Sequence, residues 1–152
     1  MIGVVETEFA CTLSDRHAAF RAMMDNAETF LAGQEIPAAV IGKMMIAVDE
    51  IVSNIFAHGA RDGEPTVSIR LHVGPDRVSA EIEDDGIAFD PLQSTEPDTG
   101  LSAEERPIGG LGIHLVRKMM DDARYDRDHG QNRLRFHKRF ALEAPHEGPE
   151  SP

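Results

Sequence analysis

A hairpin pattern at residues 67–84, VSIRLHVGPDRVSAEIED, decides the fold of this chain. Aliphatic side chains alternate with polar ones along residues 67–73, and the same period of two returns along residues 78–83. That period is typical of strands that are buried on one face only. Because a Gly-Pro-Asp turn at residues 74–76 joins the two segments, we expect them to be antiparallel neighbours in a sheet.

The segments on either side of this hairpin carry helical and strand patterns. Apolar residues recur at helical spacing before the hairpin, and a period of two returns near the end of the chain. The remaining predicted elements are a strand near residues 2–11, helices over 18–32, 37–56 and 109–120, and strands over 123–127 and 133–140 joined by a turn at 128–132. This order predicts an α+β fold, a two-layer α/β sandwich whose mixed, mostly antiparallel sheet carries its helices on one face.

The composition limits the functions that are open to the chain. Its 152 residues fit one domain, and 27 acidic against 15 basic side chains give a net charge of −12. Such a charge argues against direct binding to nucleic acid or to an anionic membrane. The single cysteine, Cys11, excludes an intramolecular disulfide, and no apolar run is long enough to span a bilayer. Since residues 1–6 do not read as a secretory signal either, we expect a cytoplasmic protein.

Three clusters of residues could carry chemistry, and the first lies in the second predicted helix. Glu50 and Asn54 are four residues apart and share a helix face beside an apolar stripe. A carboxylate there can act as a general base, and a carboxamide oxygen one turn later can ligate Mg²⁺. A solvated pair at the edge of the helix would show the same spacing.

The second cluster follows the hairpin directly. Continuing the alternation of its second strand puts Asp84, and not Asp85, on the inward face. A carboxylate at the end of a buried stripe needs a partner, and the exocyclic amine of a nucleobase would serve. Gly86 would allow a close approach of the backbone. A turn rich in aspartate and glycine is the alternative interpretation.

The third cluster is a Gly-Gly-Leu-Gly turn at residues 109–112, where a helix is predicted to start. Backbone amides at the start of a helix bind anions, and the helix dipole adds to the attraction. Such a turn would give an acidic protein a local means of holding phosphate. A glycine-rich turn is by itself a weak indication of function.

In their order and separation the three clusters resemble the sequence boxes of the GHKL ATPases, which share the histidine-kinase-like Bergerat ATP-binding fold. Residues 47–58, AVDEIVSNIFAH, look like the N box of that family. Residues 84–91, DDGIAFDP, resemble its first glycine box, and residues 109–115, GGLGIHL, resemble its second. Within this group the chain is most similar to the anti-sigma factor serine/threonine-protein kinases.

The resemblance implies a division of the chain and a role for each matching residue. It implies an ATPase domain over residues 1–140, with an ATP lid at 92–108, and a disordered tail at 141–152. Glu50 would be the catalytic base, and Asn54 would ligate the Mg²⁺ that bridges the phosphates of ATP. The other implied ATP contacts are Asp84 to the adenine amine, Gly86 and Ala88 beside the base, Gly110, Leu111 and Gly112 around the phosphates, and Arg106 in the lid.

The same resemblance implies partners. It describes a homodimeric, ATP-binding and Mg²⁺-dependent anti-sigma factor that binds neither nucleic acid nor membrane. Such a protein sequesters a sigma factor and phosphorylates a serine on an anti-sigma factor antagonist, which is known as partner switching. Two alternatives stay open. One is an ATP-gated protein-binding regulatory module without phosphotransfer, and the other is a domain that has a nucleotide-like cavity but no affinity for ATP.

Overall fold

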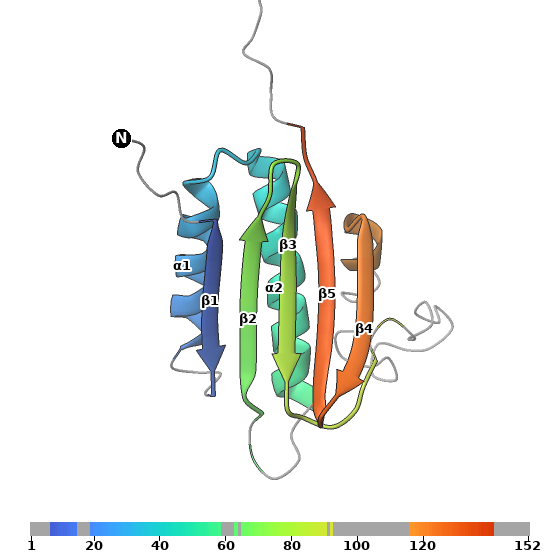
Figure 1. Ribbon diagram of the computed structural model, residues 1–152. Helices are drawn as coiled ribbons and strands as arrows, with labels where there is room; N and C mark the ends of the chain where they lie inside the picture. The colour runs from blue at the N-terminus through green and yellow to red at the C-terminus, as the bar shows by residue number, and fades with distance from the viewer. Residues whose placement is uncertain are drawn as a thin grey trace, which may run out of the picture.

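Five β-strands form one antiparallel sheet in the part of the chain that the computed structural model describes, residues 7–14, 19–58, 63, 65–90, 92 and 116–141. Their order across the sheet is β1-β2-β3-β5-β4 (Figure 1). The strands are β1 (Glu8–Leu13), β2 (Val67–Val73), β3 (Arg77–Asp84), β4 (Asp122–Asp128) and β5 (Gln131–Arg139). The sheet thus consists of two hairpins, β2–β3 and β4–β5, that join along β3 and β5, with β1 added at one edge.

Two helices, α1 (Phe20–Ala32) and α2 (Ala38–His58), cover one face of this sheet (Figure 1). Gly33 ends α1, and its N–H donates to carbonyl oxygens of the last helical turn. A further helical turn occupies residues 116–119. The expected α+β fold with helices on one face of a mostly antiparallel sheet is confirmed. Among the described helices, none has the length and apolar character needed to cross a bilayer.

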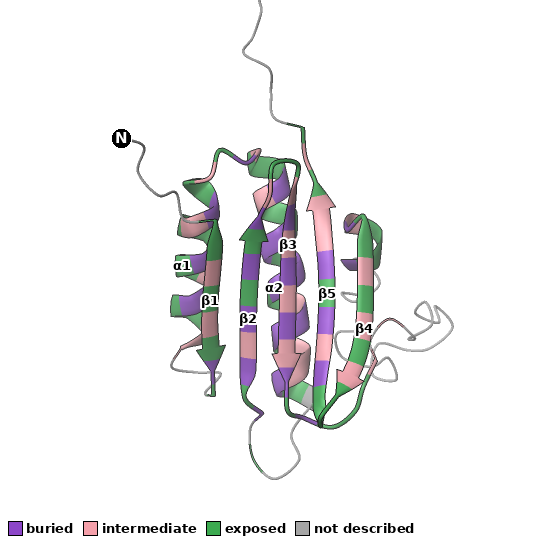
Figure 2. Cartoon of the chain, in the orientation of Figure 1, coloured by how far each residue is buried: buried purple, intermediate pink, exposed green. Residues whose placement is uncertain are grey.

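The hydrophobic core lies between the helices and the inner face of the sheet (Figure 2). In α1 the buried side chains recur every four residues, at Met23, Ala27 and Leu31, and so form a single stripe. Along β3 every second residue is buried, as the alternating pattern predicts. The largest buried side chains come from both layers: Leu13, Met23, Leu31, Met44, Val48, Val52, Val67, Ile69, Leu71, Val78, Ile82 and Val116.

The turn between β4 and β5 is shorter than the sequence pattern suggests. We expected a turn over residues 128–132, whereas the strands close on only two residues, His129 and Gly130. Their φ angles are 53° and 77°, and positive φ at both positions is typical of tight hairpin turns that match the twist of the strands. Asn132 therefore belongs to β5, and the expected turn over residues 128–132 is wrong. The sequence pattern did not indicate this, because polar residues at the start of a strand do not show the apolar alternation by which strands are recognised.

Other predicted boundaries shift or lie outside the described residues. The first strand ends at Leu13 rather than at residue 11, because Leu13 is buried and pairs with Val67 of β2. Of the helix predicted over 109–120, only residues 116–119 are described as helical. The proposed lid at 92–108, apart from Leu92, and residues 142–152 of the predicted tail lie outside the described residues.

Candidate functional site

Asp84 is the last residue of β3, and it is only 5% exposed, which confirms the inward direction predicted from the alternation. Its Oδ1 accepts hydrogen bonds from the Gly86 N–H at 2.8 Å and from Asn132 Nδ2 at 3.0 Å. Burial raises the pKa of the Asp84 carboxyl group, and these two hydrogen bonds act in the opposite direction. Asp84 Oδ2 accepts no hydrogen bond from the described residues, so it is the oxygen that a ligand can use.

Asn132 is the buried partner of Asp84, and the sequence analysis missed it. It lies directly opposite Asp84 in the β3–β5 register and is 6% exposed. Its Nδ2 also donates to the carbonyl oxygen of Ile87 at 2.7 Å. Its Oδ1 accepts from Tyr125 Oη at 2.5 Å and from Arg127 Nη1 at 2.9 Å. The alternation of buried residues along β5, which reaches Leu134 and Phe136 two and four positions later, is the signal that could have revealed its direction.

Arg127 connects three parts of this region. Besides Asn132, its guanidinium donates to the carbonyl oxygen of Gly86 at 3.2 Å and to that of Gly130 at 3.3 Å. The segment after β3 is thereby attached to the β4–β5 hairpin. On the other side, Asp85 Oδ1 accepts from the Thr66 N–H at 2.8 Å, which ties the same segment to the start of β2. The backbone around Gly86 is thus held from both sides.

Glu50 and Asn54 lie on one face of α2 and contact each other, as their spacing predicts. Asn54 Nδ2 donates to Glu50 Oε2 and to the Glu50 carbonyl oxygen, both at 2.7 Å, and both residues are half-buried. With the nitrogen engaged in this way, Oδ1 is the polar atom of the Asn54 side chain that accepts no hydrogen bond from the described residues. Asp49 and Ser53 form a separate pair on the exposed side of the helix, at 3.0 Å.

Asn54 is the one residue of the described site that would contribute an oxygen to a magnesium ion shared with a substrate. Asn54 Oδ1 is a neutral hard oxygen, the kind of ligand that Mg²⁺ accepts. Among the described residues no three His, Cys, Asp or Glu side chains gather into a metal-binding group. Mg²⁺ commonly binds through one or two protein oxygens together with substrate phosphates, so a single protein ligand is sufficient in such a site.

The structure brings one part of the predicted site together and leaves the other part untested. The C-terminal half of α2, which carries Glu50 and Asn54, and the end of β3 lie at the same end of the sandwich (Figure 1). Gly86 is buried next to Asp84, whereas Ala88 is exposed. Four predicted contacts lie outside the described residues: Arg106, Gly110, Leu111 and Gly112.

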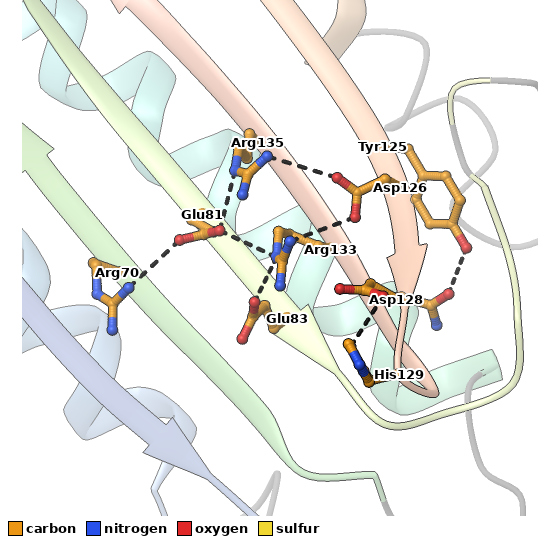
Figure 3. Close-up of polar contacts among 10 residues, drawn as sticks. Arg70, Glu81, Glu83, Tyr125, Asp126, Asp128, His129, Arg133 and Arg135 are labelled. Atoms are coloured by element: carbon orange, nitrogen blue, oxygen red, sulfur yellow. Dashed lines mark hydrogen bonds and ion pairs between the residues drawn. The ribbon is translucent and has the colours of Figure 1, made fainter.

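The face of the sheet that the helices do not cover carries a network of ion pairs (Figure 3). It is formed by Arg70, Glu81, Glu83, Asp126, Arg133 and Arg135. Arg133 lies at its centre, with Nε 2.6 Å from Glu83 Oε2 and 3.3 Å from Glu81 Oε2. Each arginine of the network pairs with at least one carboxylate. These arginines are therefore compensated within the sheet and do not form a free basic patch of the kind that binds nucleic acid.

The comparison with known families now assigns the class of protein. A model of the histidine kinase-like ATPase domain matches residues 13–138, which include both helices and, apart from most of β1, the strands of the sheet. The chain therefore belongs to the histidine kinase-like ATPase domain family. The family expected from the three sequence clusters is confirmed.

The curated relatives that the chain matches are named as protein kinases. The serine/threonine-protein kinase BtrW of Bordetella bronchiseptica is 31% identical over 109 residues, which cover 71% of this chain and 72% of BtrW. The serine-protein kinase RsbW of Listeria innocua is 34% identical over 98 residues, or 59% of this chain and 60% of that protein. RsbW of Bacillus cereus is 31% identical over 103 residues, which cover 62% of this chain and 61% of that protein. The chain thus spans about three fifths of the RsbW proteins it matches, and the expected kinship with serine kinases is confirmed.

Proposed function

We propose that this protein is an ATP-dependent serine kinase and anti-sigma factor that acts by partner switching. In this function it sequesters a sigma factor and phosphorylates a serine on an anti-sigma factor antagonist. The observation that carries the proposal is the pairing of Glu50 with Asn54 at the same end of the sandwich as the buried carboxylate of Asp84. A base, a metal ligand and a nucleobase acceptor are the three groups that this chemistry needs.

Asp84 recognises the adenine base in this proposal. Its Oδ1 is occupied by two N–H donors, and its Oδ2 accepts the exocyclic amine of adenine. The Asp84 carboxylate is buried and its Oδ2 has no donor among the described residues, so the amine supplies a hydrogen bond to that oxygen. Gly86 has no side chain and is buried beside Asp84, which lets the base approach the backbone.

Glu50 and Asn54 act at the phosphate end of the nucleotide. The hydroxyl of the target serine gives its proton to Glu50 while its oxygen bonds to the γ-phosphorus, and the bond from that phosphorus to the bridging oxygen of ADP breaks. The Asn54 N–H at 2.7 Å holds the carboxylate of Glu50 in position for that proton. When bound through Asn54 Oδ1, Mg²⁺ neutralises charge on the phosphate oxygens.

The remaining assignments are carried by the family resemblance. Residues 1–140 form the ATPase domain, with the lid at 92–108, and Arg106 contacts the terminal phosphate. The amides around Gly110, Leu111 and Gly112 hold the phosphates, and Ala88 lies near the base. The protein works as a homodimer in the cytoplasm. Its acidic surface suits a basic face of a sigma factor, so the affinity between the two is expected to fall with added salt.

The test measures phosphate transfer from labelled ATP with Mg²⁺ to the small antagonist proteins encoded in the same genome. We expect Glu50→Gln to lower the transfer rate by about 10²- to 10⁴-fold and to leave ATP affinity nearly unchanged. Asp49→Asn is the matched control, since Asp49 is an exposed acid of the same helix turn that pairs with Ser53. Equal rates for the two variants would refute the role of Glu50. ATP-dependent binding of an antagonist without any transfer would favour the regulatory module instead.

A further inference from the structure

We propose that Asn132 is a positioning residue that makes the site selective for adenine over guanine nucleotides by fixing the carboxylate of Asp84. The inference rests on the proposed function, because it assumes that a nucleotide base meets Asp84. Asn132 itself has no free polar atom for a ligand. Both of its amide hydrogens and its carbonyl oxygen are engaged within the protein.

The surroundings of Asn132 allow only one orientation of its carboxamide. Its oxygen faces the Tyr125 hydroxyl, the Arg127 guanidinium and, at 3.4 Å, the Phe89 N–H. A guanidinium and a backbone N–H can only donate, so they require an acceptor at this position. Its nitrogen faces the Ile87 carbonyl oxygen and Asp84 Oδ1, which can both accept. A flipped carboxamide would put donors against donors and an oxygen against two oxygens.

The fixed carboxamide in turn fixes Asp84. Asn132 Nδ2 and the Gly86 N–H both end on Oδ1, so rotation of the carboxylate would break two hydrogen bonds in a buried place. Oδ2 is then presented to the ligand as an acceptor only. Adenine carries an amine donor at the position where guanine carries a carbonyl oxygen. The carboxylate therefore accepts a hydrogen bond from adenine and repels guanine.

Loss of Asn132 would change the chemistry that Asp84 presents. Burial raises the pKa of Asp84 and the neighbouring charge of Asp85 raises it further, whereas hydrogen bonds from Asn132 and the Gly86 N–H and the charge of Arg127 lower it. Without the Asn132 N–H the carboxyl group rotates more freely and binds a proton more readily. A protonated carboxyl can donate to the carbonyl oxygen of guanine, so discrimination between the two bases falls.

The experiment measures the dissociation constants of Mg²⁺-ATP and Mg²⁺-GTP by isothermal titration calorimetry on the full chain. We expect the unmodified protein to prefer ATP by about 100-fold or more. Asn132→Ala is expected to lower that ratio by about tenfold or more, mainly by weakening ATP binding. Asn132→Thr keeps a side-chain donor at this position and is expected to recover part of the ratio. Gln131→Ala is the matched control, because Gln131 is the exposed amide next to Asn132, on the other face of β5.

Asn54→Ala separates positioning of the base from binding of the phosphates, since it is expected to weaken ATP and GTP equally. If Asn132→Ala does not fold, Tyr125→Phe serves in its place, because it removes only the hydroxyl that bonds Asn132 Oδ1. We expect Tyr125→Phe to lower the ratio about two- to fivefold. An ATP-to-GTP ratio that Asn132→Ala or, in its place, Tyr125→Phe leaves unchanged would overturn the inference alone. Failure of the unmodified protein to bind ATP would overturn the proposed function and the inference with it.

Discussion

Replacing Arg127 with alanine removes the side chain that attaches the segment after β3 to the β4–β5 hairpin. Two of its hydrogen bonds, to Asn132 Oδ1 and to the Gly86 carbonyl oxygen, are half-buried, and the third, to Gly130, is exposed. Each half-buried bond contributes about 1 kcal/mol, and the exposed one contributes almost nothing. Arg127→Ala is therefore expected to lower the free energy of unfolding by about 2 kcal/mol. In a chain of this length the melting temperature then falls by about 4–8 °C.

The assay is urea unfolding, followed by circular dichroism, of Arg127→Ala beside Arg124→Ala. Arg124 lies on the same strand but on the opposite face, 80% exposed, where it pairs only with Asp122 among the described residues. An exposed pair of this kind contributes a few tenths of a kcal/mol at most. Equal losses of stability for the two variants would refute the reasoning, because they would show that the contacts of Arg127 have no special weight. A changed slope against urea would instead indicate an altered unfolded state.

Three further variants or pairs test other parts of the structure. Because burial raises the pKa of Asp84, its ionised form opposes folding above that raised pKa, so Asp84→Asn should be more stable than the unmodified protein near neutral pH. This advantage should shrink as the pH falls toward the ordinary carboxyl pKa, which urea titrations at several pH values would measure. The Asp84→Asn variant should also lose ATP binding, which calorimetry would measure. Gly130→Ala should lower the free energy of unfolding by about 1 kcal/mol, because Gly130 has a φ of 77°. Gly42 lies within α2 with open space around it, so Gly42→Ala should raise the free energy of unfolding by about 0.5–1 kcal/mol. Thermal melts would measure both. Met44→Ala should cost about 2–5 kcal/mol in urea unfolding and Ile46→Ala less than about 0.5, since Met44 is 0% and Ile46 is 56% exposed; similar losses would contradict the assigned core.

Most of the described fold could be predicted from the sequence because its strands are buried on one face. The alternation along residues 67–73 and 78–83 predicted the direction of the side chains in both strands of the central hairpin, and that direction continued correctly to Asp84. Strand ends were less predictable, because a polar residue such as Asn132 looks like part of a turn until its burial is known.

The candidate site was predictable where one local pattern contained it. Glu50 and Asn54 meet because residues four apart share a helix face. The network around Asp84 was not predictable in this way, since Tyr125 and Arg127 come from β4, and the sequence of that strand, DARYDRD, has only two apolar residues to set its pattern. Which residues face Asp84 depends on the register of β3 with β5, and no local pattern encodes it.

The contact between Asp84 and Asn132 also has a consequence for the order of folding. It joins residues 48 positions apart, at the end of the ladder that links the two hairpins of the sheet. Each hairpin can form by itself within about 1–10 μs, whereas their union requires closure of a much longer loop. The proposed nucleotide site around Asp84 is therefore complete only when the two halves of the sheet meet. A bound nucleotide would stabilise the pairing of β3 with β5 and so slow the separation of the two hairpins. The fraying of β1, at the far edge of the sheet, would be unchanged.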